Sequence, residues 1–349
     1  MGSFELPDRS RRLLATLVRE YIETGEAVSS QVLARESSLG VSSATVRNLL
    51  AQLEEAGFVY QPHTSAGRVP TDRAYRVFVD QLLEGRKPAR PSATVEIRLR
   101  QQAERSPLMG DLLSDVSHLV ARAARVVAFA ISDNEGAILQ RIEFVPLGAQ
   151  RVLVVVVASD GKVTQKAIES DAPLRADDLV RAANYLNTEF AGLPLLDVRD
   201  AVAARLEMDR SLYDELLRRA LRLAQASLED ISRQQAFSVE GASALIESGS
   251  ADGVSLATLR ALLEMMDQKE RMLDLLNEYI DGPGLTVIIG AEHTAPGLRP
   301  FSLIAATAVD GGATRTVGVI GPTRIDYSRT ITLVDGTTRA VSRVLRSAS

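Results

Sequence analysis

The segment that most constrains the fold is a short amphipathic helix followed at once by a hairpin sequence bounded by prolines. Apolar residues at three- and four-residue intervals predict a helix from Ser43 to Ala56. Ser42 before it is a favourable N-cap residue, and Val41 can pack on Val46 as a hydrophobic staple. Its apolar stripe consists of Val46, Leu49, Leu50 and Leu53. The opposite face begins with small and hydrogen-bonding side chains and ends in two glutamates, so one face suits a core and the other suits a partner.

A second helix and a hairpin flank this element. A serine pair is expected to cap a preceding helix from Gln31 to Ser37, and Gly40 to close the turn between the two helices. The segment PHTSAGRVPT, from Pro62 to Thr71, follows a short apolar strand and suits a hairpin tip at a phosphate backbone, with Gly67 near its centre. An ordinary surface helix explains the amphipathic pattern alone equally well. The hairpin favours a winged helix-turn-helix whose second helix enters a DNA groove.

The polar residues of this arrangement have distinct expected contacts with DNA. Arg47 and Asn48 are candidates for base readout, because arginine pairs bidentately with guanine and asparagine with adenine. Ala44 suits contact with a thymine methyl group. Arg73 and Arg76 are candidate phosphate contacts, although a solvated arginine explains each of them as well. The remaining candidate DNA contacts, most of them to the backbone or in the minor groove, are Ser42, Ser43, Thr45, His63, Thr64, Ser65 and Arg68.

Length and composition bound the rest of the chain. Its 349 residues predict two or three domains, and 46% hydrophobic with 24% charged residues is typical of a soluble globular protein. Without cysteine there is no thiolate chemistry, and no signal peptide or membrane span is expected, so we expect a cytoplasmic protein. The net charge is −5, but residues 1–90 carry 12 Lys and Arg against 11 Asp and Glu. A localised patch of positive charge on a dimer is therefore expected.

No catalytic, cofactor or metal motif was found. GxxxxGK[ST], GxGxxG after a strand, HExxH and GxSxG do not occur, and the three histidines are scattered. The glycines around Gly311 and from Gly318 to Gly321 suit a hairpin turn and a strand end better than a phosphate cradle. We therefore expect no catalytic residues, cofactor or metal.

The remaining pattern mixes helices with antiparallel strands, which predicts an α+β protein. A linker is expected from Gly85 to Ser92, and a helical region interrupted near Pro107 after it. Because VLVVVVAS is continuously apolar, its strand is expected to be covered on both faces. Strands are predicted at 125–131, 137–145, 151–158, 163–168, 285–289, 301–309 and 314–320. Helices are predicted from Asp8 or Ser10 to residue 24 and at 73–83, 176–190, 210–233, 255–280 and 331–345.

The stretch ATVRNLLAQLEEAGFVYQPHTSAGRVPTDRAYRVFVDQLL resembles the N-terminal domain of the heat-inducible transcription repressor family, HrcA. YIETGEAVSSQVLA is similar to the first two helices of that family, VEGASALIE to its middle segment and GVIGPTRIDYSRTITLVD to its C-terminal segment. The resemblance implies a winged helix-turn-helix domain at 1–90, a GAF-like domain at 92–136 and 233–349, and an inserted α+β dimerising domain at 137–232.

The same resemblance implies a function. The implied protein is a repressor that would bind the CIRCE inverted repeat on double-stranded DNA as a homodimer, upstream of chaperone genes such as groESL and dnaK. A GroEL-type chaperonin would keep it active. Two alternatives are open: a regulator controlled by a small molecule in the GAF-like domain, and an enzyme fused to a DNA-binding domain, which the absent motifs disfavour.

Overall fold

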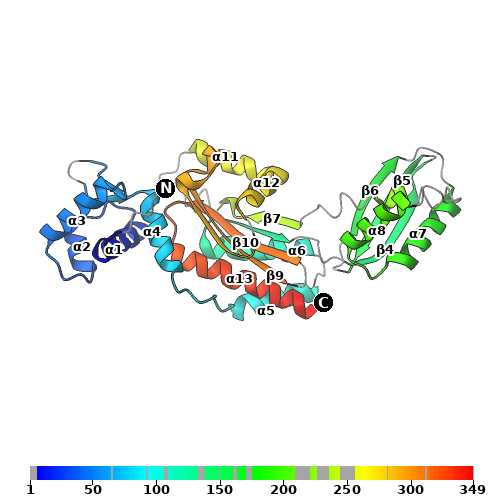
Figure 1. Cartoon of the computed structure of the whole chain (residues 1–349), viewed down its shortest axis with the longest axis horizontal. Coiled ribbons are helices and arrows are strands. Elements are labelled where there is room, and N and C mark those ends of the chain that lie inside the picture. The colour runs from blue at the N-terminus through cyan, green and yellow to red at the C-terminus, as the bar shows by residue number, and fades with distance from the viewer. Residues whose placement is uncertain are drawn as a thin grey trace.

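The computed structural model has three units in a row along its longest axis (Figure 1). We call them the N-terminal unit, the central unit and the three-stranded unit. The structure describes residues 6–63, 66–91, 93–105, 109–132, 138–148, 150–159, 163–169, 175–208, 221–225, 236–243, 256–280, 282–310 and 313–348.

The N-terminal unit consists of four helices and a two-stranded antiparallel ribbon. Its elements are α1 (Asp8–Thr24), α2 (Ser30–Glu36), α3 (Ser43–Glu55), β1 (Val59–Tyr60), β2 (Val69–Pro70) and α4 (Asp72–Leu83). Gly25 ends α1 with a left-handed conformation, φ +74°, that favours glycine. Ser29 accepts from Val32 N, and Ser42 accepts from Thr45 N. These caps lie where the sequence predicts them, because a cap is a local interaction of residues three apart.

The central unit contains a five-stranded antiparallel sheet in the order β7-β3-β10-β9-β8. Its strands are β3 (Val127–Ser132), β7 (Ala236–Glu240), β8 (Gly284–Ile289), β9 (Phe301–Asp310) and β10 (Ala313–Pro322). Alternate side chains point to opposite faces, so each face has its own core. The helices α6 (Met109–Ala124) and α13 (Tyr327–Ala348) cover one face, and α5 (Ala93–Arg105) packs on both of these helices. The other face is covered by α11 (Leu256–Asp267) and α12 (Lys269–Tyr279).

The three-stranded unit is inserted between β3 and β7. Its strands β4 (Leu139–Pro146), β5 (Arg151–Ala158) and β6 (Val163–Glu169) pair in chain order, all antiparallel. The helices α7 (Ala176–Phe190) and α8 (Leu195–Met208) bury one face of this sheet in a separate core. The side-chain amide of Asn187 bonds both N and O of Ile142 at 2.8 and 2.9 Å, which closes the outer edge of β4.

The mixed α+β character and the antiparallel strands are confirmed, and three local expectations are corrected. The strand β5 alternates between buried and half-buried side chains, because the helices among the described residues pack on one of its two faces only. The predicted helix at 255–280 is two helices that break at Gln268, and the final helix begins at Tyr327 because Asp326 caps it through Arg329 N at 3.0 Å. Sequence reasoning missed α8. The helix predicted at 210–233 lies outside the described residues, apart from a helical stretch at 221–225.

No described helix is long and apolar enough to cross a membrane. Within the same part of the chain, no three His, Asp or Glu side chains come together as a metal-binding group.

Candidate nucleic-acid interface

The helix α3 is held by its apolar stripe. Val46, Leu50 and Leu53 are at most 5% exposed and pack into the core of the N-terminal unit, while Leu49 is half-buried at the edge of that core. The Oγ atoms of Ser43 and Ser30 lie 3.1 Å apart, so the first turn of α3 is tied to the first turn of α2. The scaffold therefore fixes the direction of α3 and leaves its other face outward.

The outward face carries the residues that the sequence predicts for base readout. Arg47 and Asn48 are both exposed. Ala44, Thr45 and Ser42 are exposed beside them, while Ser43 is half-buried. One helix thus presents a guanidinium, an amide, a hydroxyl and a methyl group within its first two turns, which is the set that reads base edges in a major groove.

The ribbon is attached to the rest of the unit by its backbone. Val28 and Arg68 exchange two N–H···O hydrogen bonds of 2.9 Å, which adds the loop between α1 and α2 as a third strand-like partner. Gly67 permits this approach, because a Cβ there would lie 2.4 Å from the backbone of Val28. His63 is exposed, whereas Thr64 and Ser65 lie outside the described residues. The ribbon is therefore fixed at its base.

Arg68 and Arg73, two of the predicted DNA contacts, have partners within the chain. Arg68 pairs with Glu54 at 2.9 Å, and its side chain is 20% exposed. Arg73 donates to Ala56 O at 2.9 Å, and its guanidinium lies 4.8 Å from the ring centre of Phe58. Both arginines thus connect the C-terminal end of α3 to the ribbon and α4, and their contact with DNA stays a prediction.

Tyr60 was not among the predicted site residues. It ends β1, two residues before the proline that opens the ribbon tip, and is 48% exposed. The signal was present in the sequence, since alternation from buried Val59 places the next side chain on the outer face. An exposed aromatic ring beside the ribbon is a further candidate contact.

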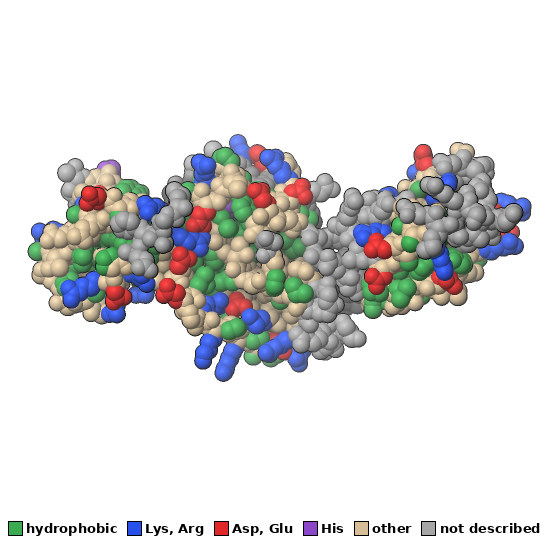
Figure 2. Space-filling view, in the orientation of Figure 1, with side chains coloured by type: hydrophobic (Ala, Val, Ile, Leu, Met, Phe, Trp, Pro, Cys, Tyr) green, Lys and Arg blue, Asp and Glu red, His purple; other side chains and the backbone are tan. Residues whose placement is uncertain are grey.

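Side chains of both charges occur on the face of the molecule shown in Figure 2. Figure 2 shows Lys and Arg side chains interspersed with Asp and Glu on all three units of the face in view. No broad surface of positive charge alone is visible among the described residues of that face.

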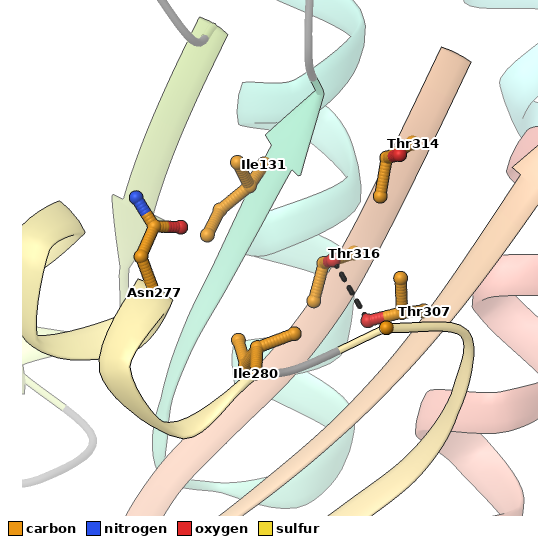
Figure 3. A pocket seen from close by; sticks show the side chains of 7 residues that line it. Ile131, Asn277, Ile280, Thr307, Thr314 and Thr316 are labelled. Carbon is orange, nitrogen blue, oxygen red and sulfur yellow. Dashed lines mark hydrogen bonds between the residues drawn. The ribbon is translucent and has the colours of Figure 1, made fainter. Parts of the chain in front are cut away.

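The central unit has a small hollow at one end of its sheet (Figure 3). Its volume is about 70 Å³, and Thr307 and Thr316 on its wall share a hydrogen bond of 2.9 Å. Pockets that enclose drug-sized ligands measure roughly 300–1,000 Å³. Such a hollow is too small for a ligand of that size. It is lined by Ile131, Asn277, Ile280, Gly282, Thr307, Thr314 and Thr316.

Comparisons with known proteins cover almost the whole chain. The family model "HrcA protein C terminal domain" matches residues 110–331. A "Heat-inducible transcription repressor HrcA" from Geobacter sulfurreducens is 36% identical over 98% of this chain and 98% of its own. A protein of the same name from Methylococcus capsulatus is 38% identical over 99% and 98%.

A solved crystal structure, described only as a hypothetical protein, has the same fold. It aligns with a TM-score of 0.63 at 24% identity, over 99% of this chain and 100% of the other. The sequence match over nearly the full length decides the assignment. This chain belongs to the HrcA family of heat-inducible transcription repressors.

Proposed function

We propose that this protein represses transcription of chaperone genes by binding an inverted-repeat operator as a homodimer. The observation that carries the proposal is the exposed N-terminal half of α3, held by a buried stripe and flanked by a ribbon fixed at its base. In this reading, residues 1–90 form a winged helix-turn-helix domain with α3 in the major groove. The relatives named as heat-inducible repressors support the choice of genes.

Base readout is assigned to Arg47 and Asn48, with Ala44 at a thymine methyl group. Both polar side chains are exposed, as groove contacts require. A gel shift with an inverted-repeat fragment from upstream of a chaperone gene tests this assignment, with a scrambled fragment of equal length as control. Binding of both fragments with equal affinity would refute sequence-specific repression.

We place the dimer contact on the three-stranded unit. The face of its sheet opposite α7 carries half-buried Leu153, Val155 and Val157 on β5, next to exposed Val145 and Val163. Within the described residues no strand pairs with the outer edge of β6, whereas Asn187 closes the edge of β4. The same face carries the exposed ion pair of Arg141 and Glu143 opposite Val157 and Val155. A partly apolar face next to an open edge is a surface that a second copy can cover by a two-fold contact.

Sedimentation velocity of single variants tests this surface. Val155→Glu at the centre of the face should shift the protein toward the monomer, because it would bury a charge without a partner. Val180→Glu is the matched control, since Val180 is 57% exposed on the helix that covers the opposite face. A dimer that survives Val155→Glu, or that is lost equally in both variants, would place the contact elsewhere.

We base the proposed domain arrangement on the family resemblance and on the two separate sheets of the central and three-stranded units. The central unit corresponds to a GAF-like domain at 92–136 and 233–349, and the three-stranded unit to the inserted dimerising domain at 137–232. We place the protein in the cytoplasm, where its operator lies, and expect the operator to be the CIRCE repeat of the groESL and dnaK genes.

Dependence on a GroEL-type chaperonin completes the proposal. A long chain of several units populates aggregation-prone intermediates, which a chaperonin can return to the native state. Operator binding after a heat pulse should recover further with chaperonin and ATP than with ATP alone. Equal recovery in both samples would remove the chaperonin from the mechanism. Control by a small molecule in the GAF-like domain is the alternative, and a ligand that binds there should raise the melting temperature.

A further inference from the structure

The contact between the N-terminal unit and the central unit centres on Arg76 of α4, the helix that lies between them in Figure 1. Its Nε donates to Oε1 of Glu292 at 2.7 Å, and its Nη2 donates to the other carboxylate oxygen and to Val287 O, the latter at 2.6 Å. A bidentate pair of this kind fixes direction as well as distance. Glu292 is itself held, because it accepts from Ile289 N at 2.9 Å. The pair joins residues 216 positions apart.

The same face of α4 makes a second contact one turn earlier. Asp72 accepts from Ala291 N at 2.8 Å. Gly290 next to it has φ +54°, and a Cβ there would lie 2.1 Å from Oδ2 of Asp72. Backbone conformation and close approach both require glycine at this position. The turn after β8 is therefore shaped to receive α4.

A contact between two tyrosine rings and a hydrogen bond to the end of α1 also join the N-terminal unit to the central unit. The rings of Tyr75 and Tyr327 lie 5.7 Å apart between centres, and Tyr327 is fully buried with its hydroxyl 2.8 Å from Ser302 Oγ. Burial raises the pKa of both tyrosines, so they stay neutral. Arg324 donates to Ile22 O at 3.1 Å and so binds a carbonyl near the C-terminal end of α1.

The chain between the two units is also attached to the central unit. Asp335 on α13 accepts from Ala89 N at 2.9 Å and pairs with Arg86 at 3.1 Å. The segment after α4 thus follows the surface of α13. This segment is attached beyond the end of α4. The attachment therefore limits how far the N-terminal unit can move, but it does not set the direction of that unit.

We propose that this contact, the α4 joint, sets the direction of α3 relative to the central unit, and that Arg76 is a positioning residue for operator binding. The proposal rests on the proposed function, in which both subunits must meet two half-sites at once. If the joint loosens, the second binding event loses effective concentration while each single contact keeps its own strength. The α4 joint comprises Asp72, Tyr75, Arg76, Gly290, Glu292 and Tyr327.

A direct phosphate contact is the other role available to Arg76, and the geometry disfavours it. Its side chain is 29% exposed, and Asp80 lies 3.4 Å from Nη1 in addition to the two acceptors of Nη2. An arginine that leaves Glu292 for DNA would abandon a bidentate partner in a partly desolvated place, which is costly.

The first experiment measures the orientation without DNA. The chain has no cysteine, so Ser38→Cys on the N-terminal unit and Ser328→Cys on α13 provide two unique spin-label sites, both exposed. Labelled full-length protein, mixed with excess unlabelled protein, should give one narrow distance distribution by pulsed electron resonance. Arg76→Ala should broaden it, whereas the control Arg12→Ala, which removes an exposed pair with Asp8, should not. A narrow distribution in Arg76→Ala would overturn the proposal.

The second experiment separates positioning from direct contact. Dissociation constants are measured on the complete inverted repeat and on a duplex with one half-site. Arg76→Ala should weaken binding to the inverted repeat by at least about tenfold and leave half-site binding unchanged. Equal loss on both duplexes would mean that Arg76 touches DNA, and no loss on either would mean that the joint does not position α3. Both results overturn the proposal.

A conservative partner variant guards against a general folding defect. Glu292→Gln keeps an acceptor for Ile289 N but removes the charge facing Arg76. Glu292→Gln should weaken binding to the inverted repeat as much as Arg76→Ala does. The double variant should bind no more weakly than either single variant, because both changes break the same interaction. Additive losses would overturn the pairing. If the unaltered protein binds neither duplex, the proposed function fails. The spin-label distances still test whether the α4 joint fixes the orientation of the N-terminal unit.

Discussion

Asn48 provides the sharpest test of how this protein reads DNA. It lies in the second turn of α3, exposed, with buried Val46 and Leu50 on either side of it in sequence. Because the asparagine is on the outward face, its truncation to alanine should leave the core unchanged, so any effect on binding reports a lost contact with DNA. An asparagine that pairs bidentately with adenine contributes about 1–3 kcal/mol of discrimination.

The expected loss follows from that contact. At about 1.4 kcal/mol for each factor of ten, Asn48→Ala should weaken binding to one half-site by about 5- to 150-fold. Both subunits of a dimer lose the same contact, so the loss in free energy on the whole operator should be twice as large. Binding to random DNA should change little, and the dependence of affinity on salt should be unaltered, because asparagine carries no charge.

Fluorescence anisotropy at fixed salt measures both affinities, on the operator and on a scrambled duplex. Gln52→Ala is the matched control, since it removes an exposed amide one turn further along the same helix. Thermal unfolding of both variants should match that of the unaltered protein. Equal weakening on operator and scrambled DNA, or a lower melting temperature for Asn48→Ala, would refute the reasoning.

Three further predictions concern stability. Ser42→Ala removes the cap of Thr45 N and should cost about 1 kcal/mol in urea unfolding, with Asn at the same position retaining most of it. Gly67→Ala places a Cβ 2.4 Å from Val28 and should destabilise the protein by roughly 1–3 kcal/mol. Burial lowers the pKa of His293, although Phe301, Glu292 and Asp72 act in the opposite sense. The unfolded state then binds more protons, so stability falls as pH drops through about 6.5, and His293→Gln should flatten melting temperature against pH.

Each of these predictions has a contrary result. If Ser42→Asn lost as much stability as Ser42→Ala, the cap would not be the cause of the loss. An unchanged urea midpoint for Gly67→Ala would mean that the ribbon moves away from Val28 at little cost. An identical decline of melting temperature in His293→Gln and the unaltered protein would assign the pH dependence to other groups.

The local elements of the candidate site were predictable because their signals lie within four residues. The stripe of α3, its Ser42 cap and the exposure of Asn48 all follow from the helical period. The start of α13 was missed although Asp326 offered the same kind of cap signal. The break at Gln268 and the helix from Leu195 to Met208 have weaker local signals.

Partners that depend on packing were not predictable. The sequence presents Arg68 and Arg73 as free cations beside a hairpin, yet one pairs with Glu54 and the other binds Ala56 O. The order of residues does not show that these groups are close together. Their distance depends on the angle between the ribbon and α3, which only the tertiary structure gives. The wing contacts of this surface therefore stay predictions, whereas the exposure of Arg47 and Asn48 is observed.

Sequence alone determined most of the helices and strands, the caps of α2 and α3, which side of α3 faces outward and which family the chain resembles. Tertiary structure decided that β7 joins β3 across a separate inserted unit, that the described helices α7 and α8 pack on one face of β5, and that Arg76 meets Glu292. The reason is physical. Periodicity and capping act between neighbours along the chain, but a pairing across 216 residues depends on which surfaces remain exposed after each element has buried its apolar side.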